Sequence, residues 1–151
     1  MTLRINDIAP NFTASSTQGE INFHDWIGDG WAVLFSHPKH KTPVCSTELG
    51  EVEKLADEFT KRNVKTIGLS VDTVDETSSW LEDINDIAGA KPNFPIIADT
   101  DMAVSKLYNM LPALEEGTSD GRTALDNETV RTVFIVGPDK KVKLYLTYPM
   151  T

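Results

Sequence analysis

The chain has 151 residues, of which 40% are hydrophobic, and this size and composition fit one compact domain around a single core. Its formal net charge is −9 at pH 7, and Lys and Arg never form a run longer than two. Nucleic acids and anionic membranes attract concentrated positive charge, so we expect neither as a partner. A small or neutral substrate fits this composition better.

The first twelve residues, "MTLRINDIAPNF", show neither the basic leader nor the apolar run of a signal peptide. No segment approaches the ~18 apolar residues of a membrane helix. The only cysteine, Cys45, cannot form an internal disulfide and cannot by itself hold a structural zinc. We therefore expect a cytosolic protein without a membrane span, in which Cys45 is either core filler or a reactive group.

The apolar run "WAVLFS", residues 31–36, is typical of a buried strand, and residues 64–72 form a second such run. Between the two runs, apolar residues recur at spacings of three and four, at Leu49, Val52, Leu55, Ala56 and Phe59. This spacing predicts one amphipathic helix. A strand, a helix and a strand in this order form a right-handed crossover unit, so the sheet is expected to be at least partly parallel.

Further along the chain, residues 76–89 predict a second amphipathic helix that ends at Gly89. The stretch "FPIIAD", residues 94–99, predicts a short strand. Another helix, stopped by Pro112, is indicated by the apolar residues Met102, Leu107, Met110 and Leu111. Residues 115–129 are polar and rich in turn residues, which predicts an exposed loop.

The last two apolar runs, residues 131–136 and 141–148, flank "GPDK" and predict an antiparallel hairpin. Alternation in the second run predicts an inward-packing apolar face that includes Val142, Leu144 and Leu146. A strand, helix and strand followed by two further strands is the order of a thioredoxin-like α/β fold. We therefore expect a central mixed sheet flanked by helices.

Cys45 falls in the first turn of a predicted helix, because Thr42 and Pro43 are a favoured N-cap and first helical residue. The free backbone N–H groups and the dipole at a helix start stabilise a thiolate, which is the nucleophilic form. A small buried hydrophobe is the other common role of a lone cysteine. Thr42 stands where the first cysteine of a C-x-x-C pair would be, so a dithiol oxidoreductase is excluded. The Thr42 hydroxyl either donates to the thiolate or a substrate oxygen, or simply caps the helix.

The stretch "HPKHKTPVCSTELG", preceded by "WAVLFS" and followed far downstream by "VRTVFIVGPDKKVKLYLTYPMT", resembles the peroxiredoxin family, in its one-cysteine, peroxiredoxin-6-like subfamily. The signature P-x-x-x-(T/S)-x-x-C is complete as Pro38, Thr42 and Cys45, and the match runs over essentially the whole chain. The resemblance implies one thioredoxin-like domain over residues 1–151 that reduces hydroperoxides without a cofactor or metal ion.

The resemblance also implies roles for individual residues. Cys45 would be the peroxidatic cysteine, which attacks the O–O bond and leaves as a sulfenic acid. Thr42 would bind the substrate oxygen, and Pro38 would shield the pocket from water. Arg131 would lower the pKa of the thiol and stabilise charge that develops on the peroxide. Taken without the resemblance, Arg131 is an ordinary charge at a strand end.

Two further residues match the active site of the subfamily. His37 stands where its members carry a histidine, and Glu48 matches a carboxylate thought to orient the arginine and the threonine. One departure concerns the pocket, because His40 and Lys41 replace the usual Asp-Phe and put a cation in place of an aromatic wall. The preferred peroxide is therefore not fixed by the resemblance.

Two other departures concern an additional activity and the end of the chain. Some members carry a serine linked to phospholipase activity, but Gly30 occupies that position here, while His24 and Asp139 remain without a nucleophile. We therefore expect no serine-based activity. The family continues into a C-terminal region that contributes an active-site arginine and dimer contacts, whereas this chain ends at Thr151.

The leading hypothesis is a thiol-dependent peroxidase of hydrogen peroxide and organic hydroperoxides. Because the chain has no second cysteine, an external thiol or thiol protein must reduce the sulfenic acid. The alternatives are a redox sensor or holdase without turnover, and a thioredoxin-like binding module with an inert cysteine. The last strand has an exposed edge, and related proteins pair this strand between subunits, so we also expect a homodimer through residues 141–148.

Overall fold

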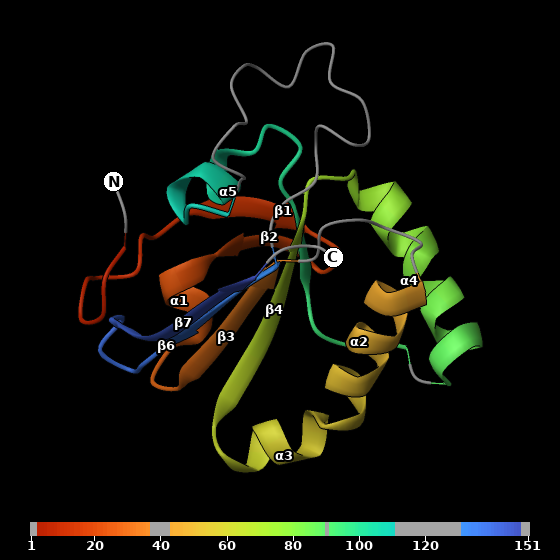
Figure 1. The fold of residues 1–151 in the computed structure, drawn as a ribbon, viewed down its shortest axis with the longest axis horizontal. Coiled ribbons are helices and arrows are strands. Elements are labelled where there is room, and N and C mark those ends of the chain that lie inside the picture. The colour runs from red at the N-terminus through yellow and green to blue at the C-terminus, as the bar shows by residue number, and fades with distance from the viewer. Residues whose placement is uncertain (1–2, 37–42, 90, 111–130, 149–151) are drawn as a thin grey trace.

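The computed structural model describes residues 3–36, 43–89, 91–110 and 131–148. Within them the fold is one seven-stranded sheet, in the order β2-β1-β5-β4-β3-β6-β7, with helices on both faces (Figure 1). The strands are β1 (Thr13–Ser16), β2 (Gly19–Asn22), β3 (Trp31–Ser36), β4 (Val64–Ser70), β5 (Ile96–Ala98), β6 (Arg131–Val136) and β7 (Val142–Tyr148). The helices are α1 (Phe23–Ile27), α2 (Pro43–Lys54), α3 (Ala56–Lys61), α4 (Val74–Ala88) and α5 (Ala103–Leu107).

The sheet is mixed, as the sequence predicts. Strands β3, β4 and β5 run parallel to one another, while β6 pairs antiparallel with β3 and with β7. At the opposite edge, β1 pairs antiparallel with β2 and with β5. The prediction of a thioredoxin-like α/β fold with helices flanking a central sheet is confirmed.

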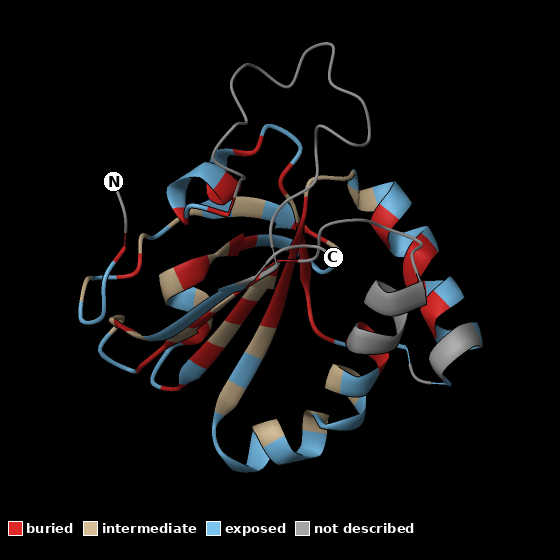
Figure 2. Ribbon diagram, in the orientation of Figure 1, coloured by how far each residue is buried: buried red, intermediate tan, exposed pale blue. Residues whose placement is uncertain are grey.

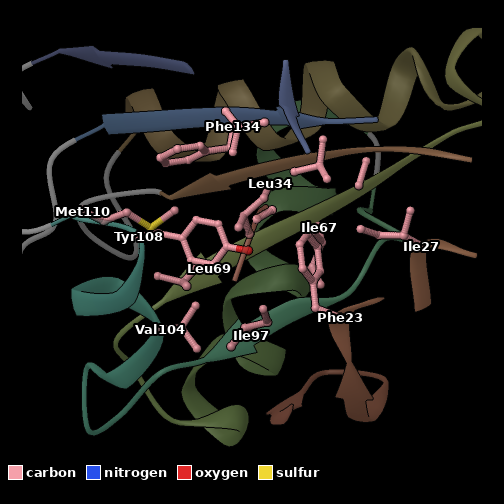
Figure 3. Packing of buried hydrophobic residues seen from close by; sticks show 14 of the residues in the cluster. Phe23, Ile27, Leu34, Ile67, Leu69, Ile97, Val104, Tyr108, Met110 and Phe134 are labelled. Atoms are coloured by element: carbon pink, nitrogen blue, oxygen red, sulfur yellow. The ribbon is translucent and has the colours of Figure 1, made fainter. Parts of the chain in front are cut away.

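Apolar side chains alternate between the two faces of the sheet and form one cluster on each. The first face, covered by α1 and α5, carries the larger cluster, in which the Tyr108 ring lies among the labelled side chains of Figure 3. The second face is covered by α2 and α4, and its cluster contains Leu49, Trp80, Leu81, Ile84, Phe94 and Ile96. Neighbouring residues illustrate the alternation, because Ile96 belongs to the second face and Ile97 to the first.

The single amphipathic helix predicted to begin at Pro43 and to carry the apolar residues from Leu49 to Phe59 is in fact two helices. α2 ends at Lys54 and α3 begins at Ala56, with Leu55 between them and 49% exposed. The backbone N–H of Leu55 is shared between the carbonyls of Glu51 (3.2 Å) and Val52 (3.1 Å), which tightens the last turn of α2. This tightening ends α2, so the predicted single helix was wrong at Leu55.

Helix α4 confirms the predicted helix and its end at Gly89, and it begins two residues before the predicted range, at Val74. The Thr73 side chain accepts a hydrogen bond from the backbone N–H of Glu76 at 3.2 Å, and Gly89 ends the helix with a left-handed φ of 71°. Among the described helices, none is long and apolar enough to cross a membrane.

The next predicted helix is shorter than expected. α5 ends at Leu107, and Asn109 takes a left-handed φ of 57°, so Met110 lies outside the helix although it is buried. The chain leaves the helical conformation before Met110, and this part of the prediction was wrong. Leu111, Pro112 and the loop predicted over residues 115–129 lie outside the described residues.

The predicted hairpin of β6 and β7 is confirmed, but its predicted inward face is wrong beyond Val142. Val142 pairs with Val136, whereas the next pair is Leu144 with Ile135, so Lys143 is an extra residue that forms a β-bulge. The bulge shifts the alternation by one residue, so the two leucines leave the face of Val142. Figure 2 shows exposed residues along β7, which include Leu144 (45%), Tyr145 (47%) and Leu146 (54%).

The N-terminal segment covers part of the edge of β7, a contact that the sequence did not predict. The backbone N–H of Asn6 donates to the carbonyl of Val142, and the N–H of Val142 donates to Asp7, both at 2.9 Å. The N–H of Ala9 donates to the carbonyl of Lys140 at 2.8 Å. Val142, the first residue of β7, and Lys140 just before the strand are therefore already paired within the chain.

Candidate active site

The carboxyl end of β3 and the start of β6 lie side by side. β3 ends at Ser36 and β6 begins at Arg131, and the antiparallel register puts Phe35 opposite Val133. Next to this pair, the backbone N–H of Thr132 donates to the Ser36 hydroxyl at 3.1 Å. The backbone of Arg131 is thus held at the sheet edge where β3 ends.

Helix α2 brings Cys45 to the same edge. The helix begins at Pro43, so Cys45 lies in its first turn, as predicted. In a crossover unit the helix starts at the carboxyl edge of the sheet, because it runs back against the parallel strands. One turn after Cys45, Leu49 is 1% exposed and belongs to the cluster of the second face, against which Phe35 packs. This packing anchors the helix that carries the cysteine.

The first turn of α2 favours an anionic sulfur. Its backbone N–H groups have no partners inside the helix, and the helix dipole places positive potential there. The first turn contains no acidic residue that would oppose a thiolate. This position can therefore support a nucleophilic cysteine.

The described residues cover part of the predicted site. The backbones of Cys45, Glu48 and Arg131 are described, and they place Cys45 and Glu48 on α2 and Arg131 at the first position of β6. The side chains of these three residues lie outside the description. The other predicted site residues, His37, Pro38 and Thr42, precede α2 and lie wholly outside the described ranges.

A hollow of about 290 Å³ lies at the opposite end of the sheet, where α3 meets the start of β4. Its lining includes Trp26, Phe59, Val64, Lys65 and Phe94, and none of the predicted site residues. Within the described ranges, no group of three His, Cys, Asp or Glu side chains is arranged to hold a metal ion. The described cavity therefore belongs to a different part of the molecule from Cys45.

The family model that describes the AhpC/TSA family matches residues 5–145 of this chain. The chain belongs to the AhpC/TSA family. Among curated members, peroxiredoxin-6 of Gallus gallus is 51% identical over 153 residues, which cover 99% of this chain and 66% of that protein. The mitochondrial peroxiredoxin PRX1 of Saccharomyces cerevisiae is 52% identical, over 99% of this chain and 56% of its own length. These relatives place the chain among the one-cysteine, peroxiredoxin-6-like members of the family.

Solved structures of AhpC/TSA proteins share this fold. A yeast mitochondrial 1-Cys peroxiredoxin superposes with a TM-score of 0.86 at 50% identity, over 99% of this chain and 70% of that chain. A cysteine-to-serine mutant of peroxiredoxin 6 from Arenicola marina gives 0.87 at 44% identity, over 98% and 66%. The chain therefore spans the conserved fold, and about two thirds of the length of these relatives.

His24 and Asp139, the two residues that the sequence related to a phospholipase element, both have hydrogen-bond partners in the structure. The His24 ring donates through Nε2 to the backbone carbonyl of Ala9 at 2.6 Å. Asp139 accepts from Lys143 Nζ at 2.8 Å and from the backbone N–H of Lys141 at 3.1 Å. The bond from Lys143 is the main reason that the pKa of Asp139 is lowered. Both side chains therefore take part in hydrogen bonds within the described fold.

Sequence reasoning missed one residue at this edge, Ser36. We treated it as the last residue of an apolar run, yet it is a buried polar residue, 6% exposed, that bonds to the start of β6. The only indication in the sequence was a hydroxyl residue at the end of an otherwise apolar strand, where a buried hydroxyl needs a hydrogen-bond partner. Its partner, Thr132, is distant in sequence, so the bond becomes visible only in the fold.

Proposed function

We propose that this protein is a thiol-dependent peroxidase of hydrogen peroxide and organic hydroperoxides. The observation that carries the proposal is the position of Cys45, in the first turn of α2 beside the end of β3, on an AhpC/TSA fold. The thiolate sulfur attacks one peroxide oxygen and the O–O bond breaks. The leaving oxygen takes a proton and departs as water or an alcohol, while Cys45 becomes a sulfenic acid.

The groups around the sulfur have separate proposed roles. Arg131 stabilises the thiolate and the charge on the leaving oxygen, and its backbone position at the start of β6 supports this role. Thr42 binds the substrate oxygen and Pro38 limits access of water. His37 acts in the same active site, as its match to the subfamily histidine suggests, and Glu48, on α2 one turn after the cysteine, orients the arginine and the threonine.

An external thiol completes the cycle, because the chain has no second cysteine to form a disulfide with Cys45. One thiol condenses with the sulfenic acid and releases water, and a second thiol then reduces the mixed disulfide and leaves as an oxidised pair. The solved yeast 1-Cys peroxiredoxin is described by a thiol resolving mechanism through the glutathione and thioredoxin systems. This likeness supports glutathione or a thioredoxin-type protein as the reductant.

We also propose that the protein forms a two-fold dimer through β7. β7 is an edge strand, and its residues 144–147 are exposed. Because the N-terminal segment already pairs with residues 140–142, the interface is narrower than the predicted range 141–148 and starts after Val142. Two more apolar residues, Ile5 (51% exposed) and Ile8 (55% exposed), flank Asn6 and Asp7 in the N-terminal segment. Such a concentration of apolar surface favours an interface between subunits.

We propose a cytosolic location, which a reducing compartment and a single unpaired cysteine support. One curated relative carries a mitochondrial name, so the two compartments are the relevant alternatives. Cell fractionation with an antibody against the native protein distinguishes them. Recovery of the protein in the mitochondrial fraction would refute the cytosolic assignment.

The decisive experiment is peroxide consumption by the purified protein, with and without glutathione or thioredoxin, beside Cys45→Ser. We expect one rapid turnover without thiol, sustained turnover with it, and neither in the mutant. Oxidation of Cys45 without sustained turnover would favour the redox sensor or holdase. A thiol that resists alkylation at neutral pH would favour the inert binding module.

A further inference from the structure

The hydrogen bond between Ser36 and Thr132 links the two strand ends of the candidate active site. The Ser36 hydroxyl accepts it from the backbone N–H of Thr132 at 3.1 Å, and the two residues are 6% and 1% exposed. The last backbone pair of β3 and β6 at this end is Phe35 with Val133. The hydroxyl therefore continues the connection between the strands one step beyond their backbone ladder.

This bond acts directly on the backbone of Arg131. The N–H of Thr132 belongs to the same planar peptide unit as the Cα and carbonyl carbon of Arg131. Holding that N–H fixes the plane, and with it the position of the Arg131 Cα relative to the end of β3. On its other side Arg131 pairs with Tyr148 of β7, so the start of β6 is held from both sides.

We propose that Ser36 is a positioning residue, which sets where Arg131 stands relative to Cys45 by holding the start of β6 against the end of β3. Ser36 ends the strand that precedes α2, and Thr132 directly follows Arg131. One bond therefore connects the two backbones that carry the thiol and the guanidinium. The attraction between these groups falls with distance, so a displaced Arg131 stabilises the thiolate less. The inference rests on the proposed roles of Cys45 and Arg131.

The test replaces Ser36 and follows the Cys45 thiol. Ser36→Ala removes the acceptor and leaves the buried Thr132 N–H without this bond. We expect the pKa of Cys45 to rise and kcat/KM for peroxide to fall about tenfold, since small displacements of catalytic groups are costly. Ser36→Thr keeps the hydroxyl and should restore both values. Ser36→Val has nearly the same shape as Ser36→Thr but no hydroxyl, so it should not restore either value. Comparison of these two variants shows whether the hydroxyl or the side-chain volume is responsible.

A matched control comes from Ser16 in β1, which β5 and β4 separate from β3. Ser16 is 4% exposed, and its hydroxyl accepts from the backbone N–H of Gln18 at 3.1 Å and donates to the backbone carbonyl of Gly19 at 2.6 Å. Ser16→Ala thus loses a bond of the same kind, accepted from a backbone N–H at a similar burial, together with its bond to Gly19. It should lower the unfolding midpoint as Ser36→Ala does, yet leave the thiol pKa and the peroxide kinetics unchanged.

A double mutant shows whether Ser36 acts through the arginine. In an Arg131→Ala background, Ser36→Ala should cause no further rise in the pKa of Cys45, because Ser36 affects the thiol only through the position of the Arg131 side chain. If Arg131→Ala alone leaves the pKa unchanged, the role of Arg131 fails and the inference falls with it. If Arg131→Ala raises the pKa but Ser36→Ala does not, the peroxidase assignment stands and the role of Ser36 is refuted. An equal rise in Ser16→Ala would also refute it.

Discussion

The hydroxyl of Tyr108 donates a 2.6 Å hydrogen bond to the backbone carbonyl of Pro10, which ties the end of α5 to the N-terminal segment. The Tyr108 ring is fully buried and meets Phe134 edge-on, with 5.3 Å between ring centroids. Burial raises the pKa of the Tyr108 hydroxyl above its ordinary value of 10.0. The folded protein therefore keeps this tyrosine neutral in alkaline solution.

Tyr108→Phe should lower the free energy of unfolding near pH 7 by about 1 kcal/mol, because the Pro10 carbonyl loses its donor. In the wild type the unfolded chain releases the Tyr108 proton above pH ~10 while the folded chain retains it, so stability falls as pH rises. Tyr108→Phe has no such proton to release, so the difference in the free energy of unfolding between wild type and mutant should shrink above pH 10.

Urea unfolding between pH 7 and 11 measures this difference. Tyr145→Phe is the control, because it removes a tyrosine hydroxyl from a side chain that is 47% exposed. A wild-type minus Tyr108→Phe difference that stays constant across the range would contradict the assignment of Tyr108 as a buried neutral group.

We predict that the Cys45 thiol titrates well below the ~8.5 of a free cysteine, because the start of α2 and Arg131 both favour the anion. Ultraviolet absorbance of the thiolate against pH gives the midpoint directly. Arg131→Ala should move that midpoint upward. A wild-type midpoint at or above the free-thiol value would remove the basis for a nucleophilic cysteine.

Serine esterase or phospholipase activity should be absent, and Gly30→Ser should not install it. A Cβ at Gly30 would lie 2.7 Å from the backbone oxygen of Asn63, so a serine there must displace the backbone. We expect the mutant to lose stability and to remain unreactive toward a fluorophosphonate probe. Stoichiometric labelling of either protein would overturn this prediction.

Leu146→Glu should convert the proposed dimer into a monomer, since it places a charge on the edge strand β7 at a residue that is 54% exposed. Leu55→Glu is the matched control, because Leu55 is 49% exposed but lies between α2 and α3. Sedimentation velocity of the three proteins at equal concentration provides the measurement. If the wild type is itself monomeric, or if Leu146→Glu remains dimeric, β7 does not form the interface.

The sequence by itself determined those features that depend on neighbouring residues. Continuous apolar runs predicted β3 and β4, and the Thr73 and Gly89 caps accompany a helix whose period was visible in the sequence. The position of Cys45 at a helix start followed from Thr42 and Pro43. Periodicity and capping act within one or two turns, so they can be read without knowledge of the fold.

Tertiary structure decided the features that depend on pairing between distant segments. The bulge at Lys143 turned Leu144 away from the predicted face, because the register with β6 decides which side of the sheet each residue occupies. The bond from Thr132 to Ser36 joins two strands that are far apart in the chain, and no local pattern signals it. Such contacts form only when the sheet brings remote residues together, and in this protein they determine how the edge that carries the candidate active site is held.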